Sequence, residues 1–440
     1  MKIRPINRFA QRITVAILAV SLLVLLSGCG TSSSQSAASA NSPASASEQA
    51  AIQRGYILIG IPNPSTGPLA GFGQGTPWTE DQALAAINKD GGIFIKSINK
   101  KLPVKFKVVD TESNPTKAAD VASQLILNDK VNLLIVRHTS DTVNPVSAMA
   151  ERYGIPCIAL DDPAETWLTG GPYKWSYLSF WSVKSVNQQY MAIWNQTGSQ
   201  TNKTVGVLFP NDSDGTTWSK IFSENLPKNG YKIVNPGTFP DGTTDFSTII
   251  SQFKQNNVQI VTGVMIPPDF ATFWKQAHQM GFNPKIVTVG KSYLFLTDAS
   301  ALGANMAQGL TGEVWWSPYS PFKSSLTGES AKDLAAAWTS ATGQQWTPTL
   351  GFKYAGMEIA YNALERAQSL NPEKIREAIG ATDMDTIVGH IQYNSQHVAE
   401  TPLTGGQWTI GKGGALQLQI INDSLAPEIP TTAKMIFPLP

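Results

Sequence analysis

The chain has 440 residues, 42% of them hydrophobic, and its 33 basic side chains nearly balance its 32 acidic ones. This length is too great for one ordinary hydrophobic core, so we expect two lobes. The balanced charge, without a block of basic residues, argues against a nucleic-acid partner. The four histidines and two cysteines lack metal-ligand spacing, so the sequence predicts no metal and no other cofactor.

The N-terminus has the parts of an export signal. Basic residues stand at positions 2, 4, 8 and 12, and an apolar run covers residues 13–26. That run is too short for a comfortable bilayer span and has the length of a signal-peptide core. The following Ser27-Gly28-Cys29 completes a segment that resembles the lipobox of bacterial lipoproteins, whose cysteine receives a lipid. We therefore predict a signal peptide over residues 1–29 with lipidation at Cys29; the alternative is an ordinary secretory signal that happens to contain a cysteine.

The next stretch, up to residue 51, is rich in Ser and Ala and nearly free of charge. Such a composition buries too little apolar surface to order itself, so we predict a flexible tether over residues 30–54. With Cys29 lipidated, Cys157 is left without a disulfide partner. It stands in an apolar run, where a cysteine is more often a small core side chain than a nucleophile.

Strands and helices alternate along the rest of the chain. The first part contains predicted strands at 56–61, 103–109, 131–136 and 155–160, and predicted helices at 78–89, 115–128 and 142–153. The rhythm restarts after residue 181, with helices at 183–194, 216–229, 246–256 and 268–280 and strands at 204–209, 231–234, 258–264 and 285–289. The last part has strands at 310–316, 391–393 and within 407–421, and helices at 331–342, 349–368 and 372–379.

This alternation predicts an α/β fold of two doubly wound parallel-sheet lobes, each sheet covered by helices on both faces. The last part of the chain returns to complete both lobes, which predicts a hinge of three crossing segments. We place the N-terminal lobe at residues 55–180 and 314–388. The C-terminal lobe then comprises residues 181–313 and 389–440.

Ligands of open α/β sheets bind beyond the carboxyl ends of the strands. The first candidate loop, residues 62–76, is rich in glycine and contains Phe72. Glycine lets the backbone approach a ligand closely, although the loop also suits a purely structural role. Its glycine spacing misses the G-x-G-x-x-G pattern, which disfavours a dinucleotide.

The second candidate loop runs from Arg137 to Thr142, after a buried strand and at the start of a helix. Free N–H groups and the hydroxyls of Thr139, Ser140 and Thr142 suit an anionic group such as a carboxylate. The alternative is a plain helix cap. Arg137 is expected to pair either with a ligand charge or with Asp161.

The third loop contains Asp161 and Asp162, whose adjacent carboxylates suit an ammonium, a guanidinium or sugar hydroxyls, or form a solvated turn. The second lobe offers a loop at 210–215 with Asp214, and further loops at 266–269 and 290–293. The chain contains no G-x-S-x-G, Walker A or H-E-x-x-H motif. These groups suit recognition, and we predict that the protein is not an enzyme.

Several segments, in order, resemble those of one known family. They are S-T-G-P-L-A at 65–70, A-I-N-K-D-G-G-I at 86–93, D-T-E-S-N-P at 110–115, T-D-F-S at 244–247 and D-T-I-V-G at 385–389. The chain resembles, from about residue 57 to about 396, the branched-chain amino acid binding family of ABC-importer proteins, which has the type I periplasmic-binding fold. The resemblance implies two α/β lobes, joined by three crossovers, that close on a solute.

The resemblance also implies roles for single residues. The carboxylate-binding serine of the family falls on Ser140, with Thr142 nearby, and an aromatic residue of the first loop is kept as Phe72. Elsewhere the chain departs from the family. Asp161 and Pro163 replace a backbone contact and a threonine of the family.

The departures continue in the second lobe. Asp214 stands where the family has a tyrosine that covers the ligand. No acid that would bind a ligand ammonium is evident near Lys291. The α-amino-acid clamp of the family is therefore altered, and relatives that bind amides, urea or aromatic acids keep the fold with a different pocket.

We therefore expect an extracytoplasmic, lipid-anchored, monomeric solute-binding component of an ABC importer. Its partners would be a small solute, a membrane permease complex and the membrane lipid joined to Cys29. The solute would be an amino acid or a related small polar or carboxylate compound, with Phe72 or Trp181 as an apolar wall. The alternatives are a binder of an amide, urea or aromatic acid, a sensing module for a membrane receptor, and a secreted Rossmann-type enzyme.

Overall fold

The computed structural model describes residues 43–440, so the predicted signal peptide, Cys29 and residues 30–42 of the predicted tether lie outside the described residues. Residues 43–54 form helix α1 (Pro43–Arg54), which corrects the tether prediction for this segment. Ala51 is fully buried, and the Arg54 guanidinium donates to the main-chain oxygens of Asp129 and Lys130 at 3.2 and 3.0 Å. These contacts hold α1 against the following domain.

The first sheet has six strands, and every neighbouring pair in it is parallel. Its order is β16 (Val398–Ala399), β7 (Ser176–Ser179), β6 (Cys157–Leu160), β5 (Leu133–Val136), β1 (Ile57–Asn63) and β4 (Val104–Asp110). All residues of β1, β5, β6 and β7 are buried. Helices cover both faces of such a sheet, which explains why its central strands are apolar runs without alternation.

The second sheet has eight strands. Its main path is β10 (Thr238–Phe239), β8 (Thr204–Pro210), β11 (Ile260–Val264), β12 (Ile286–Gly290), β13 (Thr311–Val314), β17 (Thr404–Ile410) and β18 (Leu416–Asn422), and β9 (Lys232–Val234) pairs with β8. The pairs up to β13 are parallel. The strands β17 and β18 are added antiparallel at one edge.

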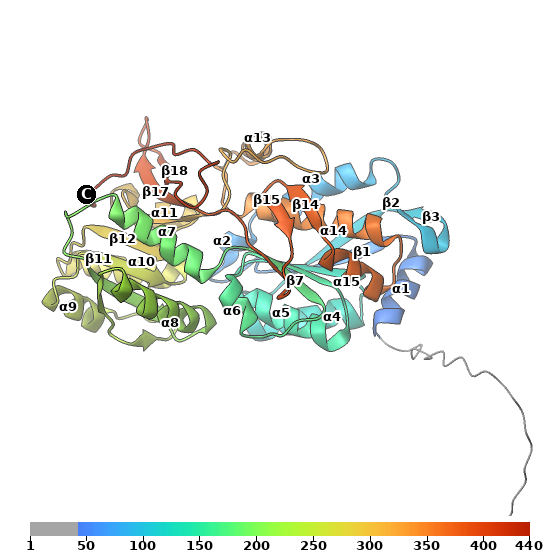
Figure 1. The fold of residues 1–440 in the computed structure, drawn as a ribbon, viewed down its shortest axis with the longest axis horizontal. Coiled ribbons are helices and arrows are strands. Elements are labelled where there is room, and N and C mark those ends of the chain that lie inside the picture. The colour runs from blue at the N-terminus through green and yellow to red at the C-terminus, as the bar shows by residue number, and fades with distance from the viewer. Residues whose placement is uncertain (1–42) are drawn as a thin grey trace, which may run out of the picture. The chain divides into compact units, whose positions relative to one another are not determined.

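Helices and small hairpins complete both lobes, and Figure 1 shows the blue, cyan and orange segments around the first sheet and the green and yellow ones around the second. The first lobe contains α2 (Ala70–Gly73), α3 (Thr76–Asn88), α4 (Pro115–Leu127), α5 (Ser140–Tyr153), α6 (Ala164–Leu168), α13 (Ala331–Thr342), α14 (Leu350–Ala367) and α15 (Pro372–Gly380). The second lobe contains α7 (Val183–Asn195), α8 (Ser213–Lys228), α9 (Ser247–Gln255), α10 (Pro267–Gln279), α11 (Leu296–Leu302) and α12 (Ala304–Ala307). The hairpins are β2 (Ile93–Ile95) with β3 (Lys100–Leu102), which flank the 3₁₀-helix η1 (Lys96–Ile98), and β14 (Asp383–Thr386) with β15 (Gly389–Gln392).

Local sequence signals account for the ends of several helices. Asn114 caps α4 by accepting the N–H of Lys117 at 2.9 Å, and Pro115 occupies the first turn, where its missing N–H costs nothing. Helix α7 begins with a capping box between Ser182 and Ser185. Such caps fix where each strand-to-helix loop ends and therefore which residues reach the edge of the sheet.

The chain passes between the lobes three times: after β7, after β13, and between β16 and β17. The last passage differs from the predicted boundary at residues 388/389. That boundary would separate β14 from β15, which pair with each other, and β16 pairs with β7 of the first sheet. The strand pairing therefore moves the third passage to residues 400–403. The predicted fold class, two parallel-sheet lobes with a three-segment hinge, is confirmed.

Among the described residues, none of the helices combines the length and the apolar character that a membrane crossing requires.

Candidate functional site

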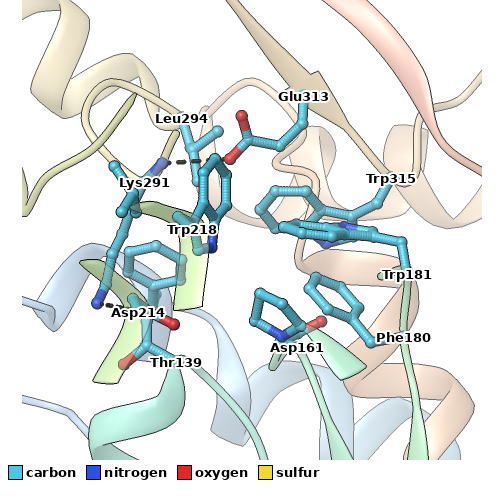
Figure 2. A pocket seen from close by; sticks show the side chains of 13 residues that line it. Thr139, Asp161, Phe180, Trp181, Asp214, Trp218, Lys291, Leu294, Glu313 and Trp315 are labelled. Carbon is cyan, nitrogen blue, oxygen red and sulfur yellow. Dashed lines mark hydrogen bonds and ion pairs between the residues drawn. The ribbon is translucent and has the colours of Figure 1, made fainter. Parts of the chain in front are cut away.

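A pocket lies where the carboxyl ends of strands from both sheets face each other (Figure 2). The space inside it, part of which is open to solvent, measures about 360 Å³. Only about 30 Å³ of it can hold the centre of a water molecule, so the walls are close together. The lining residues come from the loops and helix starts that follow seven strands and from the ends of β11 and β13 themselves: Phe72, Thr139, Asp161, Pro163, Phe180, Trp181, Asp214, Trp218, Val264, Lys291, Leu294, Glu313 and Trp315.

The loops that bring polar groups to the pocket have an unusual backbone. His138, Thr139, Asp161 and Lys291 have φ angles of 77°, 72°, 57° and 70°, in the left-handed region that side chains with a Cβ atom avoid. Asp161 and Lys291 directly follow β6 and β12, and His138 and Thr139 lie two and three positions after the end of β5. Backbone strain of this kind costs free energy and gathers at functional sites, which supports a binding role for these loop tips.

Three tryptophans form much of the wall. Trp181, Trp218 and Trp315 are at most 3% exposed, and the ring centroid of Trp181 lies 6.2 Å from those of the other two. The Nε1 atom of each is buried without a hydrogen-bond partner among the described residues. An indole N–H is only a donor. Because buried polar groups are almost always hydrogen-bonded, this wall calls for acceptor atoms in the pocket.

One cation stands among the lining residues of the described chain. Lys291 is buried, and its Nζ lies 2.9 Å from Asp214 Oδ2 and 3.4 Å from Asp141 Oδ2. Burial acts to lower the pKa of Lys291, but the carboxylates of Asp214 and Asp141 outweigh it and hold the pKa well above its usual value. Its main-chain N–H donates to Glu313 Oε1 at 3.2 Å, and the Tyr190 hydroxyl donates to the other Glu313 oxygen. Figure 2 shows Lys291 reaching Asp214 on the side of Trp218 away from Trp181 and Trp315.

Asp161 is the acidic residue that the first lobe contributes to the lining of the pocket. Both of its carboxyl oxygens are buried and accept no hydrogen bond from the described residues. His138 Nδ1 lies 3.0 Å from Asp161 Oδ2, but not at an angle that makes a hydrogen bond, and burial holds the pKa of His138 well below its usual value, so this contact is not an ion pair. Burial raises the pKa of Asp161 against the opposing charges of Lys353 and Arg137.

Of the eight ligand-binding residues expected from the sequence, four line this pocket together: Phe72, Thr139, Asp161 and Asp214. Ser140 lies one position beyond Thr139, at the first position of α5, and its buried hydroxyl has no hydrogen-bond partner among the described residues. Thr142 is buried in the first turn of the same helix. A ligand contact by Ser140 or Thr142 stays a prediction.

Asp162 is fully buried and does not line the pocket. Burial, with a smaller contribution from Asp214, raises its pKa well above the usual range. Arg137 is 1% exposed and its guanidinium pairs with Glu80 Oε1 at 2.7 Å. It also donates to the main-chain oxygen of Lys353 at 2.9 Å. Arg137 thus pairs with Glu80, a carboxylate far away in the sequence, and not with Asp161; a ligand contact by Arg137 stays a prediction.

Sequence reasoning missed much of the second-lobe wall. The sequence indicates a loop after a strand around Lys291, but no pattern in it assigns a role to Lys291, Trp218, Glu313 or Trp315. The high tryptophan count of 12 indicated aromatic walls. The individual tryptophans had no signal of their own, because one lies a full turn inside α8 and another on a crossing segment.

Among the described residues, no group of three or more His, Cys, Asp or Glu side chains is placed to hold a metal ion. The site thus combines an aromatic wall, unpartnered donors and acceptors, and one internal cation, all positioned by loops of two separate sheets. This is the architecture of a binding protein that encloses a small polar molecule between two lobes.

Comparison with known proteins gives the family. Residues 57–415 match the family described as periplasmic binding protein, so the chain belongs to the periplasmic binding protein family. The Leu/Ile/Val-binding protein homolog 7 of Brucella abortus (strain 2308) is 24% identical over 374 residues, which cover 81% of this chain and 90% of that protein.

Solved structures share the fold. The leucine-binding protein LivK of Thermotoga maritima MSB8 matches with a TM-score of 0.70 and 19% identity, over 84% of this chain and 99% of that one. A solute-binding protein of an ABC transporter from Rhodopseudomonas palustris BisB5, solved with 3,4-dihydroxybenzoic acid, matches with a TM-score of 0.66 and 17% identity, over 85% and 99% of the two chains. The fold is thus that of the type I periplasmic binding proteins.

Proposed function

We propose that this protein is the extracytoplasmic solute-binding component of an ABC importer and that its two lobes close on a small polar solute, an amino acid or a related carboxylate. One observation carries the proposal: buried polar atoms without partners, from both lobes and from the crossing segments, line one pocket. A bound solute would satisfy them. Family membership and the names of the relatives, which include binding proteins for leucine and for an aromatic acid, support the same function.

Closure follows from the position of the lining residues. Thr139 and Asp161 belong to the first lobe, and Asp214 belongs to the second. A solute that contacts both sets is bound more tightly by the closed arrangement than by an open one, and it therefore shifts the population toward closure. Trp181 and Trp315 lie on two of the crossing segments, so their fluorescence should report the movement.

The first experiment is a thermal-shift screen of amino acids, amides, urea, polyamines, aromatic acids and sugars, followed by small-angle scattering with each hit. A ligand at one hundred times its dissociation constant should stabilise the protein by about 2.7 kcal/mol, and the radius of gyration should fall on binding. If no compound shifts the melting temperature, or if binding leaves the radius of gyration unchanged, closure on a solute is refuted. A sugar as the only hit would refute the amino acid or carboxylate class.

A matched pair of variants tests the pocket itself. Trp218→Phe removes the unpartnered N–H of a residue that lines the pocket, and the loss of one hydrogen bond to the solute, about 1.4 kcal/mol, should weaken binding roughly tenfold. The control is Trp274→Phe, because the buried Trp274 N–H donates to the main-chain oxygen of Met306 at 2.8 Å, away from the pocket. Equal affinities for the two variants would contradict the assignment.

The proposal extends to attachment at the membrane. The segment that ends at Cys29 supports a lipid anchor, and with it a monomeric protein that delivers solute to a permease. A Cys29→Ala chain should fail to incorporate an alkyne-labelled fatty acid and should leave the membrane fraction. Labelling that survives the substitution would exclude lipidation at this cysteine.

A further inference from the structure

Lys291 places a positive charge inside the pocket that belongs to the protein itself. Its side chain is 7% exposed, and its ammonium group contacts Asp214 of α8 and Asp141 of α5. These two acids come from opposite lobes. The ammonium group is therefore already neutralised by the carboxylates that a cationic ligand would otherwise use.

The other second-lobe acid that lines the pocket, Glu313, already accepts hydrogen bonds from the protein itself. Glu313 accepts hydrogen bonds from the Tyr190 hydroxyl and from the main-chain N–H of Lys291. Of the described second-lobe acids that line the pocket, Asp214 leaves one oxygen, Oδ1, without a hydrogen-bond partner. A ligand ammonium group that approached this oxygen would come close to the ammonium of Lys291, and two like charges in a water-poor site repel each other strongly.

The first lobe offers little to a cation either. Asp161 has two unpartnered oxygens, but burial raises its pKa, which favours the uncharged acid. His138, Lys353 and Arg137 are the titratable or charged groups that act on it from the neighbouring elements. A protonated Asp161 donates a hydrogen bond and so prefers an acceptor to an ammonium group.

The remaining polar atoms are mostly donors. The indole N–H groups of Trp181, Trp218 and Trp315 and the hydroxyl of Thr139 are buried without partners among the described residues. The four residues that carry these donors line one small pocket, and N–H and O–H donors match the oxygens of a carboxylate. The aromatic rings that carry these donors match an apolar or aromatic body beside it.

From this arrangement we infer that Lys291 is a built-in counter-ion and that the pocket selects small carboxylates without a primary amine over the corresponding α-amino acids. The inference rests on the proposed function and narrows its substrate class. It also makes Lys291 a specificity-determining residue, because its ammonium group takes the place that the amine of an amino acid would need.

Matched ligand pairs test the inference on the intact protein. Leucine is compared with 4-methylpentanoate, and phenylalanine with 3-phenylpropanoate, by isothermal titration calorimetry. We expect the amine-free acid of a pair to bind at least tenfold more tightly than the amino acid. Equal or tighter binding of the amino acids overturns the inference while leaving solute capture intact. If none of the four compounds binds, the inference is overturned as well. The wider thermal-shift screen then decides whether the protein captures a solute of another class.

A variant tests the role of the charge. Lys291→Met leaves Asp214 and Asp141 without their cation, and the preference for the amine-free acid should fall at least tenfold. The control is Lys285→Met at the other end of β12, where the Lys285 ammonium donates to the main-chain oxygen of Gln200 at 2.6 Å and does not reach the pocket. An unchanged preference in folded Lys291→Met protein refutes the counter-ion role.

The single variant leaves two buried carboxylates unpaired and is therefore at risk of misfolding. The double variant Lys291→Met/Asp214→Asn removes both charges of the closer pair and should also lose most of the preference. If the double variant folds and keeps the full preference for the acid, the selectivity does not come from Lys291.

Discussion

The ion pair between Arg137 and Glu80 separates a structural role from a ligand-binding role at the edge of the pocket. The two side chains are 1% and 0% exposed, and Arg137 NH1 lies 2.7 Å from Glu80 Oε1. Arg137→Met leaves the Glu80 carboxyl group buried and unpaired, a loss that typically costs about 3–5 kcal/mol. Burial already raises the pKa of Glu80, so protonation of Glu80 limits the loss, and we expect a value near the lower end of that range.

The assay is urea unfolding followed by circular dichroism, together with ligand affinity measured on the folded variant. The free energy of unfolding should fall by about 3 kcal/mol, while affinity changes less than about threefold because Arg137 does not line the pocket. The double variant Arg137→Met/Glu80→Gln should recover at least half of the loss. Lys117→Met is the control, because its pair with Glu112 at 3.5 Å is exposed and should contribute no more than about 1 kcal/mol.

One result would refute this reasoning. If Arg137→Met kept its stability within about 0.5 kcal/mol of the parent and lost ligand affinity more than tenfold, Arg137 would act on the ligand. The pairing expected from the sequence would then be the better description of this residue.

Three further predictions concern the pocket and the core. Burial raises the pKa of Asp161 to about 7, so its proton should be present below that pH and lost above it. Calorimetry from pH 6 to 9 should show carboxylate affinity falling above pH 7. The fall should be smaller in Asp161→Asn, which keeps Lys353 and Asp212, two groups whose pKa values are also about 7. A Cβ atom at Gly290 would lie 2.8 Å from the Trp218 ring and 2.9 Å from the Tyr190 hydroxyl. Gly290→Ala should therefore lower the free energy of unfolding by about 1–3 kcal/mol, measured by thermal unfolding, and weaken binding. An unchanged affinity would mean that Trp218 is not part of the wall. Burial raises the pKa of the Cys157 thiol, so a Cys29→Ala chain should react with a thiol reagent only after unfolding in urea; rapid labelling of the native protein would contradict the burial.

Most of the strands and helices could be predicted because each has a local signal. The apolar run that became β5 and the proline-capped pattern of α4 need no tertiary contact to be recognised. Strand β7 was missed because serines stand at both of its ends and shorten the apolar run. Helix α1 was missed because its composition is that of a linker, and it is held in place by contacts of Arg54 with residues more than 70 positions away.

The candidate site could be predicted as a set of loops more reliably than as a set of side chains. Parallel strands end at one edge of a sheet, so the loops that contain Thr139, Asp161 and Asp214 were expected to gather. Which residue of each loop turns inward depends on backbone dihedral angles that the residue type does not reveal. At the start of α5 a left-handed backbone at Thr139 places that residue, rather than Ser140, in the wall of the pocket.

The sequence by itself determined the two-lobed α/β fold, the family and the loops from which a site would be built, because periodicity, turn residues and ordered motifs are properties of neighbouring residues. The tertiary structure decided that Glu80 neutralises Arg137 and that Asp214 and Asp141 neutralise Lys291. These pairings join residues 57, 77 and 150 positions apart. Charge in a buried site is set by whichever groups the fold brings within a few ångströms, and this proximity is invisible along the chain.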